Sequence, residues 1–168
     1  MDARRFQRSK TRTSLVRGSD SRSRLATLSY CVYAIDYLDA ALALKRSQTP
    51  IRAAKTYLAC HSIELALSAY LSLRGRSTDT LGRGLLEHDL AQLLHDAESS
   101  GLSEVAQLTK GQRRQIKEAA PYYSKMVFQY PAVAEAVRGY PGAPNVPVLL
   151  ATATVLISAV RELIGTRG

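Results

Sequence analysis

Apolar residues recur at steps of three and four along this 168-residue chain, and this spacing is the strongest constraint on its fold. One stripe lies between residues 25 and 42 and contains Leu25, Leu28, Val32, Ile35, Leu38 and Leu42. A second helical pattern runs from Val146 to about Ile164. Ala and Leu dominate, whereas β-branched residues are sparse and scattered, which favours helices over strands. The sequence therefore predicts an all-α fold.

Helix-end signals divide the chain into segments and predict an antiparallel bundle of four to five helices. These signals are Thr49 and Pro50 before a long second helix, Gly75 after it, Asp89 before a third helix, and Asn145 before the last. Short helices are expected in the connection between the third helix and the last. Within that connection, Pro121 is expected to kink or split a helix.

The positive charge is concentrated at the N-terminus. The whole chain carries a formal charge of +9, and residues 1–24 hold eight basic side chains but only two acidic ones. Residues 1–23 also lack apolar periodicity, so we expect a disordered or extended basic arm before a bundle domain at 24–168. Such an arm attracts phosphate-rich partners, or it is a solvated tail. Its candidate nucleic-acid-binding residues are Arg4, Arg5, Arg8, Lys10 and Arg12.

Several classes of site and location have no support in the sequence. The three His and two Cys residues fall on separate segments at unsuitable spacings, so neither a metal site nor a cofactor is expected. Cys31 and Cys60 are interpreted as small buried side chains of a cytoplasmic protein. The longest apolar run, of about 15 residues, is too short for a membrane span, and no membrane partner is expected.

A polar stripe interrupts the second helix in the stretch HSIELALSAYL, residues 61–71. Helical spacing places Tyr57, His61, Glu64, Ser68 and Leu71 on one face. Two interpretations are open: the stripe lines a cleft for a nucleotide, or it joins helices through buried hydrogen bonds. A buried carboxylate is costly without partners, so Glu64 is expected to be bonded in either case, to tyrosine hydroxyls, to Lys125 or to the third helix.

Tyrosines gather in two further places. The segment PYYSKMVFQYP interleaves aromatic residues with one lysine, which suits base stacking and phosphate binding but also suits core packing. Its candidates for a nucleic-acid edge are Tyr122, Tyr123, Lys125 and Tyr130. In the first helix, Tyr30, Tyr33 and Tyr37 form a stripe that is either part of the core or the seam of a dimer.

Three motifs in order, HSIELALSAYL, EHDLAQLLHDAESSGL and YYSKMVFQYP, resemble the HEPN family, named for higher eukaryotes and prokaryotes nucleotide-binding. The resemblance covers about residues 25–164. It implies a bundle of four or five helices, a homodimer and an intracellular role in bacteria or archaea. Many HEPN proteins are metal-independent ribonucleases of toxin–antitoxin or defence systems, paired with a nucleotidyltransferase. Others are nucleotide- or RNA-binding modules.

The catalytic motif of the resembled family is Arg, four to six residues, then His, usually on the last helix. The last helix of this chain contains Arg161 but no histidine. The spacing occurs once elsewhere, from Arg83 to His88 in RGLLEH, just before the predicted start of the third helix. A phosphate could bind His88 and Arg83 there, or His88 could simply pack over the helix start.

The leading hypothesis is a dimeric HEPN-like module that binds a nucleotide or RNA through His61, Glu64 and His88, with Tyr123, Lys125 and Tyr130 as further ligand-binding candidates. It would work beside a partner, such as a nucleotidyltransferase, in a toxin–antitoxin or defence setting. One alternative is a divergent metal-independent ribonuclease that uses Arg83 and His88. The other is a structural or interaction module whose basic tail binds non-specifically.

Overall fold

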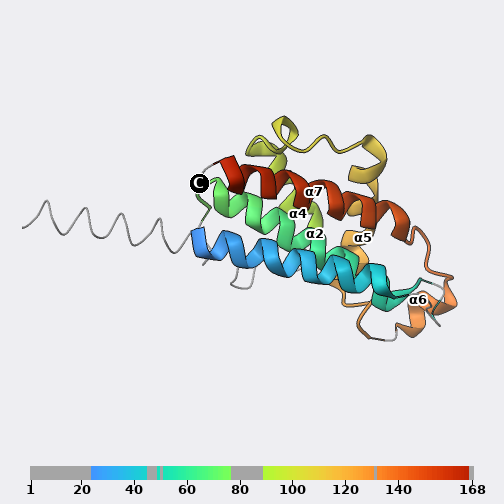
Figure 1. Cartoon of the computed structure of the whole chain (residues 1–168). Coiled ribbons are helices and arrows are strands. Elements are labelled where there is room, and N and C mark those ends of the chain that lie inside the picture. The colour runs from blue at the N-terminus through green and yellow to red at the C-terminus, as the bar shows by residue number, and fades with distance from the viewer. Residues whose placement is uncertain (1–23, 45–48, 50, 77–88, 131, 167–168) are drawn as a thin grey trace, which may run out of the picture.

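The computed structural model describes residues 24–44, 49, 51–76, 89–130 and 132–166, and all regular structure in these ranges is helical (Figure 1). Residues 24–43 form what we call the N-terminal helix. The elements after it are α2 (Ala53–Leu73), α4 (Leu90–Ser99), the 3-10 turn η1 (Leu102–Glu104), α5 (Lys110–Ser124), α6 (Val133–Val137) and α7 (Val146–Thr166). The all-α prediction is confirmed. The basic arm lies outside the described residues.

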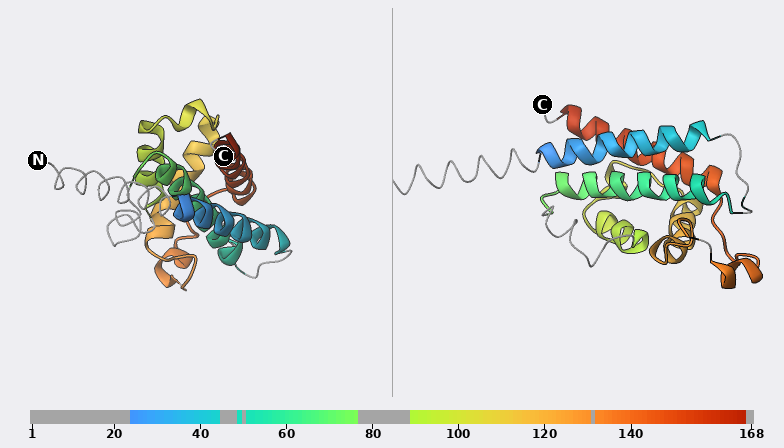
Figure 2. Two further views of the ribbon diagram at one scale, coloured as in Figure 1. Left: turned by 60° about the vertical axis from the view of Figure 1, so that its left-hand side comes forward. Right: turned by 90° about the horizontal axis from the view of Figure 1, so that it is seen from below.

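The central element of the bundle is α2, which packs against α7, α4 and α5 (Figures 1 and 2). The N-terminal helix runs antiparallel to α2. The Thr27 hydroxyl donates to the Ser72 hydroxyl at 3.0 Å, and the Ser62 hydroxyl donates to the Ala34 carbonyl at 2.7 Å. The first bond joins the start of the N-terminal helix to the end of α2 and the second joins their middles, which fixes the direction and register of the pair.

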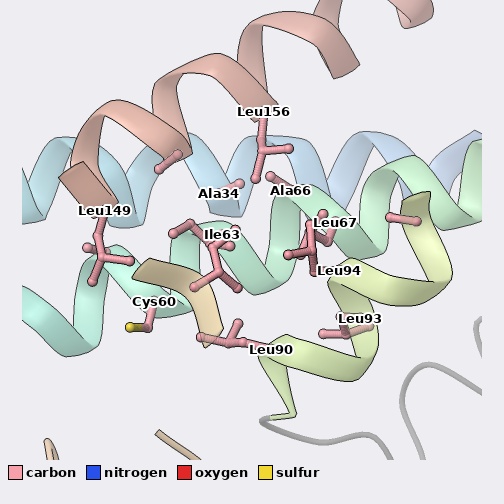
Figure 3. Packing of buried hydrophobic residues seen from close by; sticks show 14 of the residues in the cluster. Ala34, Cys60, Ile63, Ala66, Leu67, Leu90, Leu93, Leu94, Leu149 and Leu156 are labelled. Atoms are coloured by element: carbon pink, nitrogen blue, oxygen red, sulfur yellow. The ribbon is translucent and has the colours of Figure 1, made fainter. Parts of the chain in front are cut away.

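The core lies where α2 meets its neighbours (Figure 3). Ile63 and Leu67 of α2 have no exposed surface, and neither does Leu94 of α4 or Leu149 of α7. Alanines of α2, among them Ala59 and Ala66, are also buried and allow the neighbouring backbones to approach closely. A helix that is buried on most of its circumference belongs at the centre of a bundle, and this position fixes where the polar stripe of α2 lies.

The helix ends follow the sequence signals in most places. The Asp89 side chain accepts from the backbone N–H groups of Ala91 and Gln92, and Asn145 Oδ1 accepts from Val148. Gly75 follows α2 with φ of +82°, a conformation that glycine adopts without strain. At the start of α2, Thr49 Oγ1 accepts from Ala53 N–H at 2.8 Å. Pro50 lies outside the described residues.

The expectation that Pro121 splits a helix is wrong. Helix α5 continues through Pro121 to Ser124, so the proline occupies the last turn of the helix. There it removes only the hydrogen bond to the Lys117 carbonyl, and Lys117 is exposed, so water can replace the missing donor. The start of α5 carries a reciprocal cap between Thr109 and Gln112 that the sequence analysis did not identify.

The apolar stripe of the N-terminal helix is not its main buried face. The buried positions are Thr27, Cys31, Ala34, Leu38 and Ala41. Of the stripe, only Leu38 is buried, and Leu25, Leu28, Val32 and Leu42 are between 46% and 67% exposed. The N-terminal helix and α2 lie close together, since the Ser62 hydroxyl reaches the Ala34 carbonyl. Such a close approach requires small side chains on the face between the helices.

Helix α7 has the length and mean hydropathy of a membrane span, and among the described residues it is the one helix with both properties. The core helix of a folded bundle can have the same properties. Leu149, Ala153, Leu156 and Val160 of α7 are buried against the bundle, whereas Leu163 is half-buried.

Candidate functional site

The polar stripe of α2 faces two other helices. Tyr57, His61 and Glu64 lie one above another on α2, because residues three and four apart share a helix face. Tyr123, near the end of α5, and Tyr37, on the N-terminal helix, reach the same place. We call these five residues the His61 cluster. Three helices therefore contribute to it.

Three polar contacts that share two protons hold the cluster together. The Tyr123 hydroxyl donates to Glu64 Oε2 at 2.6 Å. His61 Nδ1 lies 2.9 Å from the same Glu64 oxygen and 2.7 Å from the Tyr123 oxygen. An ionised carboxylate only accepts, so the proton between His61 and Glu64 is on Nδ1. The prediction that a tyrosine hydroxyl bonds Glu64 is confirmed.

The second ring nitrogen of His61 is in a different situation. Its Nε2 makes no hydrogen bond to any other residue that the structure describes, and the His61 side chain is 20% exposed. With Nδ1–H held by a carboxylate, a neutral imidazole presents Nε2 as an acceptor and a protonated one presents it as a donor. This geometry can bind a ribose hydroxyl in the first state and a phosphate in the second.

Two tyrosine rings fix the plane of the imidazole. Tyr57 stacks on His61 with ring centroids 5.6 Å apart and planes 10° apart. Tyr37 meets His61 edge-on, with centroids 4.3 Å apart. The Nε2 edge is thereby held in one orientation before any ligand binds.

The electrostatics of the cluster centre on Glu64. Burial, and then the negative charge of Glu64, raise the pKa of Tyr123 far above its usual value, and the hydrogen bond to Glu64 adds to this effect. The pKa of Tyr30 is raised by the same two causes. For Tyr57, burial and Tyr37 raise the pKa, while a hydrogen bond with Gln129 opposes the shift. These tyrosines stay protonated near neutral pH and can donate hydrogen bonds.

The other predicted site residues are distributed differently. Tyr123 is 1% exposed, so it contributes its hydroxyl to Glu64 and offers no ring to solvent. Lys125 and Tyr130 are exposed in the turn that follows α5. Arg83, His88 and the arm residues lie outside the described ranges. Two hypotheses therefore stay predictions: that His88 joins the His61 cluster, and that Arg83 and His88 form a nuclease site.

Two members of the cluster were not predicted as site residues. Tyr57 had a usable signal, because it lies four residues before His61 on the predicted polar stripe. Tyr37 had none, because it comes from another helix and only the packing of the N-terminal helix on α2 brings it to His61. Among the described residues, no group of three or more His, Cys, Asp or Glu side chains is placed to hold a metal ion.

A scan against protein-family models and searches of curated proteins and of solved structures find no match to this chain.

Proposed function

We propose that this chain is a HEPN-like nucleotide- or RNA-binding module and that the Nε2 edge of His61 contacts the ligand. The observation that carries the proposal is the asymmetry of His61. Its Nδ1 is bonded to Glu64 and Tyr123, whereas its Nε2 has no partner among the described residues. A carboxylate that holds one ring nitrogen orients the other toward a ligand.

A purely structural role explains less of this geometry. The bond from Tyr123 to Glu64 already joins α5 to α2 without a histidine. His61 adds a partly exposed ring that two tyrosines clamp and whose outer nitrogen is open. RNA and nucleotides offer phosphate oxygens and ribose hydroxyls, which suit both protonation states of that nitrogen. The basic arm would add a sequence-independent attraction to the same ligands.

The test is to replace His61 with glutamine in the full chain. We expect the affinity for AMP and for a short single-stranded RNA to fall about tenfold, because one hydrogen bond to a charged group is lost. Fluorescence anisotropy with labelled RNA, with unlabelled AMP as competitor, measures both affinities. The control is His95→Gln, since His95 is exposed on α4 and lies outside the His61 cluster. Equal affinities for His61→Gln and the control would reject the proposal.

A further variant separates the site from the basic arm. Replacing Arg4, Arg5, Arg8, Lys10 and Arg12 with glutamine keeps the chain at full length. If this change removes all RNA binding while His61→Gln has no effect, the alternative of a structural module with a non-specific tail is correct. The toxin–antitoxin or defence setting, with a nucleotidyltransferase as partner, belongs to the same proposal through the resemblance of the sequence motifs.

A second copy of the chain is the proposed partner for the exposed face of the N-terminal helix. Leu25, Leu28 and Val32 are successive members of one stripe and are 67%, 46% and 54% exposed. Exposed apolar stripes of this kind mark interfaces. Asp36 and Asp39 follow them on the same helix, while Arg24 precedes them. An antiparallel second copy would place Arg24 near the partner's acidic end, with Val32 at the centre of the contact.

The dimer has its own test. Val32→Asp places two like charges at the centre of the antiparallel contact, so we expect it to convert a dimer into a monomer. Sedimentation equilibrium measures the molar mass at several concentrations. Val137→Asp is the matched control, because Val137 is 83% exposed on α6, away from the stripe. A wild-type chain that is monomeric at all concentrations contradicts the proposal, as does a dimer that Val32→Asp leaves intact.

A further inference from the structure

Two hollows lie side by side at the start of α2. The first has a volume of about 410 Å³ and lies between the start of α2 and the start of α7, with Arg52, Tyr140 and Asn145 in its wall. The second has a volume of about 290 Å³ and lies between the start of α2 and the α5–α6 connection, with Gln129 and Tyr130 in its wall. Ile51 and Tyr140 line both hollows, so the two adjoin each other.

The first hollow offers hydrogen-bond donors beside an aromatic ring. The Arg52 guanidinium makes no hydrogen bond or ion pair with another described residue, and Arg52 is exposed. Asn145 uses its side-chain oxygen to accept from Val148, which leaves its amide NH₂ group for a ligand. Arg52 and Tyr140 also have positive φ angles of 48° and 53°, a conformation that costs energy and is found at ligand sites. A planar guanidinium fork beside a ring suits a phosphate and its attached base.

The second hollow is linked to His61 through Gln129 and Tyr57. Its wall is mainly apolar, and the ring of Tyr130 is 66% exposed at its edge. Gln129 also lines this hollow, and its side chain is hydrogen bonded with Tyr57. Tyr57 in turn stacks on His61. Gln129 therefore connects the wall of the second hollow to the His61 cluster through Tyr57.

We infer that the two hollows and His61 form one track for single-stranded RNA, with a phosphate at Arg52 and bases against Tyr140 and Tyr130. This inference rests on the proposed function and narrows its ligand from a nucleotide to a strand. Arg52 directly precedes α2, and the eight positions from Ala53 to His61 span about 12 Å along the helix axis. One mononucleotide cannot span that distance, whereas a strand of several nucleotides can. Cationic groups with interleaved aromatic rings are the usual surface for single strands.

The test replaces Arg52 with asparagine, which removes the guanidinium but tolerates the positive φ angle. For a labelled RNA hexamer and the full chain, we expect an affinity loss of about tenfold. We also expect the slope of log affinity against log salt concentration to fall by about one. Arg52→Lys keeps the charge and should keep the slope. Arg138→Asn is the matched control, because Arg138 is exposed beside α6 and lines neither hollow.

Comparing the Arg52 and His61 single variants distinguishes the possible results. The inference predicts that Arg52→Asn and His61→Gln each weaken hexamer binding while the thermal unfolding midpoint stays unchanged for Arg52→Asn. If only His61→Gln weakens binding, the proposed function stands and the track is wrong. If Arg52→Asn lowers the hexamer affinity no more than Arg138→Asn does, or leaves the salt slope unchanged, the proposed phosphate contact at Arg52 is wrong. If only Arg52→Asn weakens binding, or neither variant does, both the proposed function and the track fail.

Discussion

Leu67→Ala is expected to lower the free energy of unfolding by about 2 to 5 kcal/mol. Leu67 has no exposed surface and lies on the central helix α2, where the core side chains of α4 and α7 converge (Figure 3). The change removes the transfer free energy of the lost carbons and leaves a cavity. Ile63, Leu94 and Leu156 border this region from three helices, so the walls of the cavity cannot collapse by moving one segment.

Urea denaturation followed by circular dichroism measures this loss. We expect the midpoint concentration to fall while the dependence of the free energy on urea stays the same. Leu42→Ala is the matched control, because Leu42 is 55% exposed near the end of the N-terminal helix, and its cost should stay within about 0.5 kcal/mol. Similar costs for the two variants would mean that α2 is not the centre of the core.

Much of the fold was predictable because helix ends depend on capping residues that are close in the sequence. Asp89 and Asn145 cap their helices through backbone groups two or three positions away, so their roles can be inferred without knowledge of tertiary contacts. Pro121 was misjudged because its effect depends on position within the helix. In the last turn it removes a single bond at an exposed carbonyl, whereas in mid-helix it would break the helix.

The face of the N-terminal helix could not be predicted from hydropathy. A pattern of large apolar residues points to Leu25, Leu28 and Val32, but the face against α2 consists mainly of small side chains such as Ala34. Close packing of two helices selects small residues, and these carry little signal in a hydropathy pattern. The larger residues are consequently left exposed, which is why a second copy of the chain is proposed to cover them.

The candidate site was predictable only where it depends on spacing within one helix. The three-residue spacing of His61 and Glu64 is local and correctly placed both side chains on one helix face, but their hydrogen bond to each other was not predicted. Tyr123 follows Glu64 by 59 positions, and only the packing of α5 against α2 brings its hydroxyl to the carboxylate. The open Nε2 of His61 depends on the arrangement of three helices. No pattern within a single segment could have indicated it.

The free energy of unfolding of Tyr123→Phe is expected to approach that of the wild type as the pH rises above 10. At neutral pH the variant should be less stable by about 1 to 3 kcal/mol, because the half-buried Glu64 loses a donor while the ring packing is kept. Burial, followed by the charge of Glu64, raises the pKa of Tyr123 in the folded chain above the ordinary value near 10. The folded chain therefore keeps a proton that the unfolded chain releases.

The direction of the pH effect follows from this difference. The stabilisation from the protonated hydroxyl is complete below pH 10 and is lost above it, by about 1.4 kcal/mol for each pH unit. Phenylalanine has no proton to lose, so the variant should lack this part of the alkaline decline and retain only the part due to other groups such as Tyr30 and Tyr57. Urea unfolding between pH 8 and about pH 11 measures both curves. Tyr33→Phe removes a hydroxyl from a ring that is 58% exposed, and an equal narrowing there would show that the buried bond to Glu64 is not the cause.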